Sequence, residues 1–482
     1  MKIRLLLFVL LICCFGCSSV SSKKLSDFQI ESPKYSPAEP ELWQMENGIQ
    51  VAFIEDHELP LVRATFYYSG GVLSQRPDEL GVASMVGEQM REGGAGKYSP
   101  DELNLVLEKL SASISSSAGD EYGTVSFRAL SSDFETILPL FADVVQRPRF
   151  DQRRLAIAKG QARESILRRR DDPATIAWIG YIQNAFAGTP YGWIKGEQDV
   201  QRITRDTLIK FYTRVVGPRD AVLAISGDIS IERLKDQLNL TFGSWNPKNV
   251  ERFVPPLGEV KASPGIYFVP TQFNQTSITM GQVGPKRLEP DWYAVDVLND
   301  IFGAEGFGVS RLFQKVRTQL GLAYSVYGNS YPGPVIGKNV IGLQTKSSST
   351  ADALVATLEV LQELQEEPVS DAELEVANRV VSNSFVFQFE SPYGVVQRWA
   401  VLKMLDYPED YDSLYLKRRS EVSAKDVLEA ANTRWDISKF VVIVVGNDEA
   451  RSSLEELMKN PPSVLSGMTI SYADFDEILH VK

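Results

Sequence analysis

The chain contains almost no histidine: its 482 residues include two, His57 and His480. Hydrolytic zinc sites commonly use two or more imidazole nitrogens, and serine or cysteine hydrolases need an imidazole beside the nucleophile. Two histidines so far apart in the sequence cannot form a histidine-rich zinc site on this polypeptide alone. We also find no Ser/His/Asp or Cys/His set, which argues against a metal-independent enzyme with a rebuilt site.

Cysteine is confined to the beginning of the chain. All three cysteines fall within the first 17 residues: Cys13, Cys14 and Cys17. The rest of the protein therefore has no pair for a disulfide and no thiolate metal site.

Long apolar runs are also lacking beyond the N-terminus. The run Leu5–Phe15 follows Lys2 and Arg4 and is too short to span a bilayer comfortably. Residues 1–16 resemble a bacterial lipoprotein signal peptide, with Cys17 as the lipidated residue. An ordinary secretory signal with an incidental cysteine is the alternative.

The location that this signal predicts is the bacterial cell envelope. Ser18 follows Cys17, whereas an aspartate at this position commonly retains such lipoproteins at the inner membrane. We therefore expect an outer-membrane-anchored lipoprotein in the periplasm, with residues 17–41 as a tether and membrane contact only through the N-terminal lipid. The formal net charge of -12 excludes nucleic acid as an expected partner, because phosphate binding needs a basic surface.

The second half of the chain repeats the pattern of the first. Pro77-Asp78 opens a predicted helix, as Pro290-Asp291 does, and a buried strand ends at Gly227 as another ends at Gly446. These pairs lie 213 and 219 residues apart. Because strands alternate with amphipathic helices in both halves, we expect two similar α+β lobes.

The boundaries of these lobes follow from the repeat. We expect an N-terminal lobe at 42–244, a proline-rich linker at 245–264, a C-terminal lobe at 265–456 and a C-terminal extension at 457–482.

Four segments carry a resemblance to a known family. They are an opening hairpin, a helix, a Pro-Tyr-Gly segment and a helix followed by a strand: Asn47–Gly71, Leu80–Gly96, Thr189–Gly196 and Ser310–Tyr327. In this order they resemble the pitrilysin/insulinase family, metallopeptidases with an H-x-x-E-H motif. The resemblance spans most of the chain and implies two homologous lobes, each a mostly antiparallel β-sheet faced by α-helices.

The resemblance also shows which residues stand at the positions of the zinc motif. Ser84 and Glu88 replace the two histidines, Gly87 replaces the glutamate base, and Ser165 replaces the distal carboxylate ligand. Two histidines four residues apart on a helix face one metal ion, and the glutamate deprotonates the attacking water. None of these four residues restores that chemistry. We therefore expect no metal or other cofactor on this chain.

The second lobe keeps what the first has lost. Arg317 lies near the end of a predicted helix that Ser310 can cap and Gly321 can end, and Tyr324 lies in the strand that follows. In the resembling family, an Arg and a Tyr at this spacing donate hydrogen bonds to the peptide near the scissile bond. Either residue alone could be structural: Arg317 as a cation at a helix C-terminus, Tyr324 as a strand aromatic.

The combination predicts half of a two-chain enzyme. Some bacterial members of the family are heterodimers in which one subunit holds zinc and the other supplies the Arg–Tyr pair. We therefore expect a pseudoenzyme subunit that binds peptide or unfolded protein through Arg317 and Tyr324, while a homologous partner supplies zinc and the general base. Proteolysis would then need both chains. The alternative is a catalytically inert structural or binding protein of the same fold.

Overall fold

The computed structural model describes residues 38–246, 250, 257–304, 308–474, 476 and 478, all in one unit that begins at Pro37. The predicted signal peptide, Cys17, most of the tether, part of the linker and His480 lie outside the described residues. Among the described residues, no helix has both the length and the apolar character needed to cross a bilayer.

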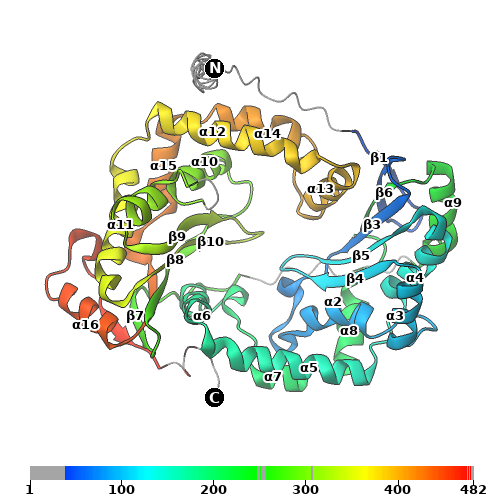
Figure 1. Ribbon diagram of the computed structural model, residues 1–482, viewed down its shortest axis with the longest axis horizontal. Coiled ribbons are helices and arrows are strands. Elements are labelled where there is room, and N and C mark those ends of the chain that lie inside the picture. The colour runs from blue at the N-terminus through cyan, green and yellow to red at the C-terminus, as the bar shows by residue number, and fades with distance from the viewer. Residues whose placement is uncertain are drawn as a thin grey trace, which may run out of the picture. The chain divides into compact units, whose positions relative to one another are not determined.

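Two six-stranded β-sheets organise the described part of the chain, which is of the expected α+β class (Figure 1). The first sheet has the order β1-β2-β6-β3-β5-β4 and the second β12-β7-β11-β8-β10-β9. The strands of the first sheet are β1 (Glu41–Gln44), β2 (Gln50–Glu55), β3 (Leu61–Tyr68), β4 (Ser113–Ala118), β5 (Gly123–Leu130) and β6 (Val222–Gly227). Those of the second are β7 (Gly265–Pro270), β8 (Gln275–Gly284), β9 (Ala323–Tyr331), β10 (Gly337–Lys346), β11 (Val441–Gly446) and β12 (Ile470–Tyr472).

The two sheets share one pairing pattern, as a duplicated lobe requires. The pairs β2·β6 and β7·β11 are parallel, and the strands from β6 to β4 and from β11 to β9 are antiparallel. The outermost strands differ, because β1 is antiparallel to β2 whereas β12 is parallel to β7. Strand β12 comes from the segment predicted as a C-terminal extension, so residues beyond the repeat complete the second sheet.

The strands β6 and β11 show why both faces of each sheet are covered. Their sequences, VLAISG and VVIVVG, are almost continuously apolar, and every residue in them is buried. A strand that is apolar on both faces needs packing on both sides. Each sheet therefore lies between two layers of helix.

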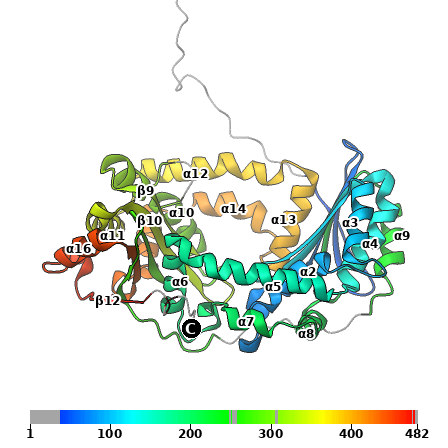
Figure 2. The same ribbon diagram turned by 60° about the horizontal axis from the view of Figure 1, so that its bottom comes forward.

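One face of each sheet packs against helices of its own half. Figure 2 shows α3, α4 and α9 gathered on one side of the first sheet. The helices on this face of the first sheet are α2 (Val82–Glu92), α3 (Pro100–Lys109), α4 (Phe134–Gln146), α8 (Arg205–Val215) and α9 (Ile231–Phe242). On the second they include α10 (Trp292–Phe302), α11 (Thr350–Glu366), α15 (Ala424–Arg434) and α16 (Asp448–Leu457).

The other face of each sheet is covered by a helix from the opposite half. Helix α6 (Pro173–Ala185) packs on β8 and β11, and α13 (Pro392–Met404) packs on β2, β3 and β6 (Figure 1). Both exchanged helices begin with a proline, 219 residues apart. In the sequence they follow the long helices α5 (Gln152–Leu167) and α12 (Asp371–Phe385). The remaining described α-helices are α7 (Glu197–Arg202) and α14 (Tyr411–Ser420).

Hydrogen bonds fix both exchanged helices. The Tyr181 hydroxyl of α6 donates to the carbonyls of Gln282 and Asn339, at 3.0 and 2.9 Å. The hydroxyls of Tyr393 in α13 and Thr65 in β3 lie 2.7 Å apart. Each sheet therefore has one of its faces covered by a helix from the other half of the chain.

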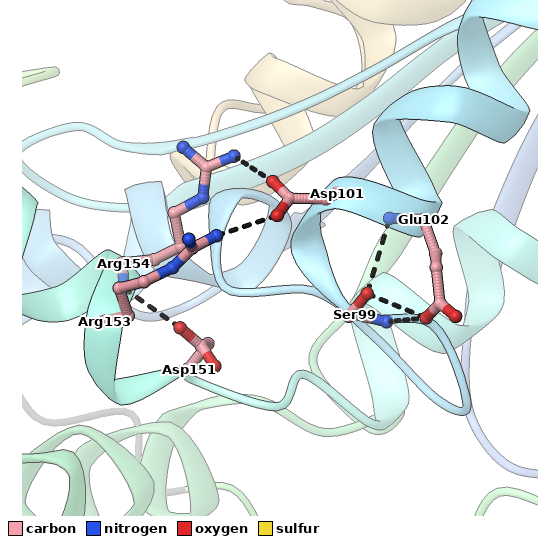
Figure 3. A network of polar contacts seen from close by, with 6 residues as sticks. All are labelled: Ser99, Asp101, Glu102, Asp151, Arg153 and Arg154. Carbon is pink, nitrogen blue, oxygen red and sulfur yellow. Dashed lines mark hydrogen bonds and ion pairs between the residues drawn. The ribbon is translucent and has the colours of Figure 1, made fainter.

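Helix α3 begins with a capping box (Figure 3). The Ser99 hydroxyl accepts from the Glu102 N–H at 3.4 Å, and the Glu102 carboxylate accepts from the Ser99 N–H at 2.8 Å. The hydrogen bonds from the Ser99 backbone and hydroxyl lower the pKa of Glu102.

Helix α5, which carries Ser165, is fixed to that first turn (Figure 3). Asp101 of α3 accepts from the guanidinium of Arg153 at 2.7 Å and from that of Arg154 at 3.1 Å. Asp151 caps α5 by accepting from the Arg154 N–H at 3.0 Å. These contacts hold the start of α5 in place beside α3.

Candidate functional site

The zinc-motif positions lie on α2, as the sequence predicted, but the helix is shorter than the segment Leu80–Gly96. It begins after Gly81, whose φ of 86° is left-handed, and ends before Gly93. Ser84 is half-buried, Gly87 is buried and Glu88 is exposed. Ser165 is exposed on α5.

Gly87, at the position of the catalytic base, is a point of close backbone approach. A Cβ on this residue would lie 2.4 Å from the backbone nitrogen of Ala118 and 2.6 Å from the carbonyl carbon of Ser117. Both atoms belong to β4, and neither can move without the sheet. The place where a glutamate side chain would begin is therefore filled by the backbone of the neighbouring strand.

The surroundings of Glu88 are mixed in charge. Partial desolvation, together with Glu92, raises the pKa of Glu88, while Lys195 opposes that rise. Burial and the nearby Arg169 lower the pKa of Lys195. The Lys195 stem lies so close to Gly81 that a Cβ there would meet its Cδ at 2.6 Å. A zinc ion near Glu88 would thus face Lys195 as well as Glu92, with no imidazole among these residues.

The residues present do not fit zinc. Ser165 lines an open cavity with Glu164, Arg168 and Arg169, and the Glu164 carboxylate accepts from Arg168 at 2.8 Å. The described residues hold no group of three or more His, Cys, Asp or Glu side chains that could bind a metal ion. Sequence reasoning missed Lys195, because nothing in its segment indicates that its side chain reaches α2.

Helix α2 also closes the edge of the first sheet. Gly119 donates to the Tyr122 carbonyl at 2.9 Å, and hydrogen-bonded pairs alternate along an antiparallel ladder. Ile114, Ser116 and Ala118 therefore turn their backbone groups away from β5. Arg91 of α2 donates through Nε to the Ile114 carbonyl at 3.1 Å. An added strand would have to displace this guanidinium, a contact that the sequence did not reveal.

Arg317 lies in a π-helical turn, not in the α-helix that the sequence predicted. The π-turn spans Phe313–Gln319, and the Leu320 N–H donates five residues back to the Lys315 carbonyl at 3.0 Å. The Arg317 guanidinium lies 4.8 Å from the centre of the Phe313 ring and the residue is exposed. Such turns are rare overall, but those that do occur often lie at functional sites.

Two details of this segment were predicted wrongly and one correctly. Ser310 does not cap the turn: it is buried, and its hydroxyl has no partner among the described residues. The helical spacing of Leu312, Val316 and Leu320 predicts that they share an apolar face, but Leu320 is 47% exposed. Gly321 does end the turn in the left-handed conformation, with φ of 63°.

Tyr324 is the extra residue of a β-bulge. Ser325 pairs with Gln344 and Ala323 with Thr345, so Tyr324 has no partner in β10. A bulge redirects the side chain that it carries, and Tyr324 is 74% exposed. The predicted pair thus lies on consecutive elements at the edge of the second sheet, and both members occupy backbone irregularities.

The rest of that edge is covered beyond the bulge. The Gly328 N–H donates to the Gly303 carbonyl at 3.1 Å, and the Ser330 N–H donates to the Asn299 side chain at 2.8 Å. By the same alternation, the backbone N–H and C=O groups of Val326 also point away from β10. In the described part of the chain, no backbone hydrogen bond reaches Val326 on that side, but the residue is only 6% exposed. The exposed part of this edge is therefore the bulge at Tyr324.

Two family models match the chain, over well more than half of its length. The model described as insulinase, peptidase family M16, matches residues 50–187, and the model described as the peptidase M16 inactive domain matches residues 202–380. The chain belongs to peptidase family M16. The M16 fold of two lobes is therefore as the resemblance implied.

Some similar proteins are named as proteases and others as non-peptidases. The chain is 24% identical over 405 residues to the non-peptidase homolog YmxG of Helicobacter pylori, covering 83% of this chain and 92% of that protein. It is 26% identical over 362 residues to an uncharacterized zinc protease of Mycobacterium bovis, covering 74% and 82%.

Solved structures of this M16 fold agree with the topology. The crystal structure of a peptidase M16 inactive domain from Pseudomonas fluorescens superposes with a TM-score of 0.76 at 25% identity, covering 85% of this chain and 98% of that one. A protease from Helicobacter pylori, at 17% identity and a TM-score of 0.73, covers 85% and 100% and shows the fold alone. The inactive M16 fold is consistent with a non-catalytic subunit.

Proposed function

We propose that this M16 chain is the non-catalytic, substrate-binding subunit of a two-chain zinc peptidase. A homologous partner with an intact H-x-x-E-H motif supplies zinc and the general base. The observation that carries the proposal is the contrast between the lobes: α2 has lost every zinc-motif residue, while Arg317 and Tyr324 occupy two exposed irregularities at one sheet edge.

The two side chains suit peptide binding. An exposed guanidinium and a phenol both donate hydrogen bonds to a carbonyl oxygen, and both can stabilise the oxyanion that forms when water attacks. An extended peptide adds to a sheet edge through main-chain hydrogen bonds. Since Arg91 closes β4, the exposed bulge at Tyr324 is the part of the second sheet's edge where the peptide would bind.

Co-expression tests the two-chain proposal. The mature chain is produced with an H-x-x-E-H homologue from the same genome, and cleavage of an unstructured peptide is measured. We expect turnover only from the mixture, and its loss on chelation. A chain that stays monomeric beside every such homologue would overturn the proposal.

Two substitutions test the roles of the pair. In the mixed complex, Arg317→Ala and Tyr324→Phe should each lower kcat about 10- to 100-fold, because each removes a donor to the oxyanion. The matched controls are Arg379→Ala, at an exposed position on α12, and Tyr472→Phe, an exposed strand tyrosine. Unchanged turnover by all four variants of an intact complex would favour the inert structural or binding protein instead.

The proposed location is the outer membrane, on its periplasmic side, through lipid on Cys17. It rests on the N-terminal sequence, in which Cys17 follows a short apolar run. Incorporation of labelled fatty acid should be lost in Cys17→Ser, and the chain should then leave the membrane fraction. Retention of label in that variant would contradict the lipoprotein assignment.

A further inference from the structure

A cavity of about 770 Å³ lies beside β9 and β10. Its walls are largely aromatic and proline side chains from α6, the Pro-Tyr-Gly segment and the β9–β10 hairpin. The aromatic members are Trp178, Tyr191, Trp193, Tyr327 and Tyr331. Its volume lies within the roughly 300–1,000 Å³ of ordinary ligand sites, and such sites are mostly apolar with few polar groups.

The charged groups around this aromatic cavity leave it with no net charge. Glu121 is neutralised by an ion pair with Arg287. The Lys338 ammonium lies 5.6 Å from the centre of the Trp178 ring and is directed to that ring. Asp120 is exposed at the wall and has no ion pair in the described part of the chain. The charges of Lys338 and Asp120 balance, and the remaining lining suits an uncharged group.

The position of the cavity connects it with the edge at Tyr324. Side chains alternate between the two faces of a strand, so Ser325, Tyr327 and Tyr331 lie on the face of β9 opposite Val326. The Tyr327 ring covers Gly342 of β10, where a Cβ would meet it at 2.4 Å. Tyr327 and Tyr331, which line the cavity, follow Tyr324 by three and seven residues on the same strand. A peptide held at Tyr324 is therefore about 10 Å from Tyr327 in the cavity wall.

We propose that the aromatic cavity is a specificity pocket for one large apolar side chain, aromatic by preference, of the bound peptide. This inference rests on the proposed function, since the occupant belongs to the peptide held at Tyr324. Aromatic rings pair favourably edge-to-face with rings such as those of Trp178 and Tyr327. The pocket accepts Phe, Tyr or Trp and rejects Asp and Glu.

Matched peptides test the pocket directly. Three fluorescently labelled, unstructured peptides that differ at one central residue, Phe, Ala or Asp, are titrated against the full mature chain. Burial of the phenyl ring should make the Phe peptide bind about tenfold more tightly than the Ala peptide. Ile336→Trp and Leu73→Trp fill the cavity from two different segments of its lining and should each remove that preference. Ile157→Trp, exposed on α5, should keep it.

Each outcome separates the inference from the function beneath it. Loss of the Phe preference in both filled variants, with the Ala peptide still bound, supports the pocket. A preference that survives in both filled variants, each with an unchanged circular dichroism spectrum, overturns it. Equal binding of all three peptides by the unaltered chain also overturns the pocket but leaves peptide binding intact. Failure of every peptide to bind counts against the proposed function itself.

Discussion

At the scale of single residues, Gly87 is required by packing and not merely left over from a lost motif. Gly87→Ala should lower the free energy of unfolding by about 1–3 kcal/mol, because its Cβ would overlap the backbone of β4. Gly160→Ala is the control: Gly160 lies within α5 with nothing within 4 Å of an added Cβ. That change should raise the free energy by about 0.5–1 kcal/mol. Urea denaturation measures both.

The same contact predicts that the zinc site cannot be rebuilt by residue identity alone. The triple variant Ser84→His, Gly87→Glu, Glu88→His restores the motif, but its glutamate must start where β4 already lies. We expect less than one zinc ion per five chains by atomic absorption, and reduced stability. Stoichiometric zinc with unaltered stability would show that α2 can move away from β4.

His57 gives a pH dependence that is simple to measure, because the chain has only one other histidine. Hydrogen bonds to Asp228 and then to Glu55 raise the pKa of His57 above 6.5, with Nδ1 2.6 Å from Asp228 and Nε2 2.7 Å from Glu55. A raised folded pKa means that the stabilisation is present below pH 6.5 and is lost as pH rises through the folded value. An NMR titration of the imidazole should show the raised pKa of His57, and denaturation at several pH values should show the loss of stability.

Asp228→Asn supplies the control for that titration. Without the first carboxylate, the midpoint of the His57 resonance should fall toward 6.5, and so should the pH at which stability declines. An unchanged midpoint would mean that the two contacts do not persist in solution.

Residue identity predicted some of these features and not others. The loss of the motif at Ser84 and Gly87 is visible in the sequence, and so is the left-handed turn at Gly321, since glycine after a helix is a local signal. The packing of Gly87 on Ala118 and the contact of Arg91 with Ile114 join residues 31 and 23 positions apart. No local pattern encodes such contacts.

At the scale of elements, the π-turn is held by an ion pair that titrates. Arg311, just before the π-turn, pairs with Glu373 at the start of α12, with Nε 2.7 Å from the carboxylate. Burial alone would raise the pKa of Glu373, but Arg311 and the hydrogen bonds from Ser370 lower it to about 2. A lowered folded pKa means that this stabilisation is present above pH 4.5 and is lost as pH falls toward 2.

Glu373→Gln tests that contribution. The difference in denaturation midpoint between the unaltered chain and this variant should be largest above pH 5 and should shrink between about pH 4.5 and 2. Glu375→Gln, exposed two residues away, is the matched control and should give only a small difference. A constant offset for Glu373→Gln would exclude the ion pair as its cause.

Elements were predictable where their pattern is local. The apolar runs at β6 and β11, their 219-residue spacing and the amphipathic α2 follow from composition and periodicity. The π-turn and the bulge at Tyr324 do not, because each depends on register. One added residue between Ala323 and Ser325 reverses the phase of the side-chain alternation, but the stretch before the bulge is too short to show that reversal in the sequence. Sequence reasoning therefore located Arg317 and Tyr324 but gave them regular surroundings.

At the scale of the whole molecule, the repeat identifies two lobes but not the exchange between them. Both α6 and α13 lie within their own half in sequence, so their order alone would assign each to that half. That assignment would be wrong, because each helix packs on the apolar face of the other half's sheet. Val396 and Ala400 of α13, for example, pack with Val222 and Ala224 of β6. Only the assembled structure shows which sheet each helix covers.

This exchange predicts that the halves depend on each other for folding. Separate chains 38–246 and 257–482 should each be soluble only poorly and should bind a hydrophobic dye, because each exposes one sheet face and one apolar helix. Co-expressed, they should purify together with the circular dichroism of the intact chain.

Within the intact chain, Val396→Asp should lower the free energy of unfolding by about 2–4 kcal/mol by burying a charge. Lys403→Asp, exposed on the same helix, should change it little. A first half that folded alone, with the melting temperature of the intact chain, would show that α13 is dispensable to the first sheet.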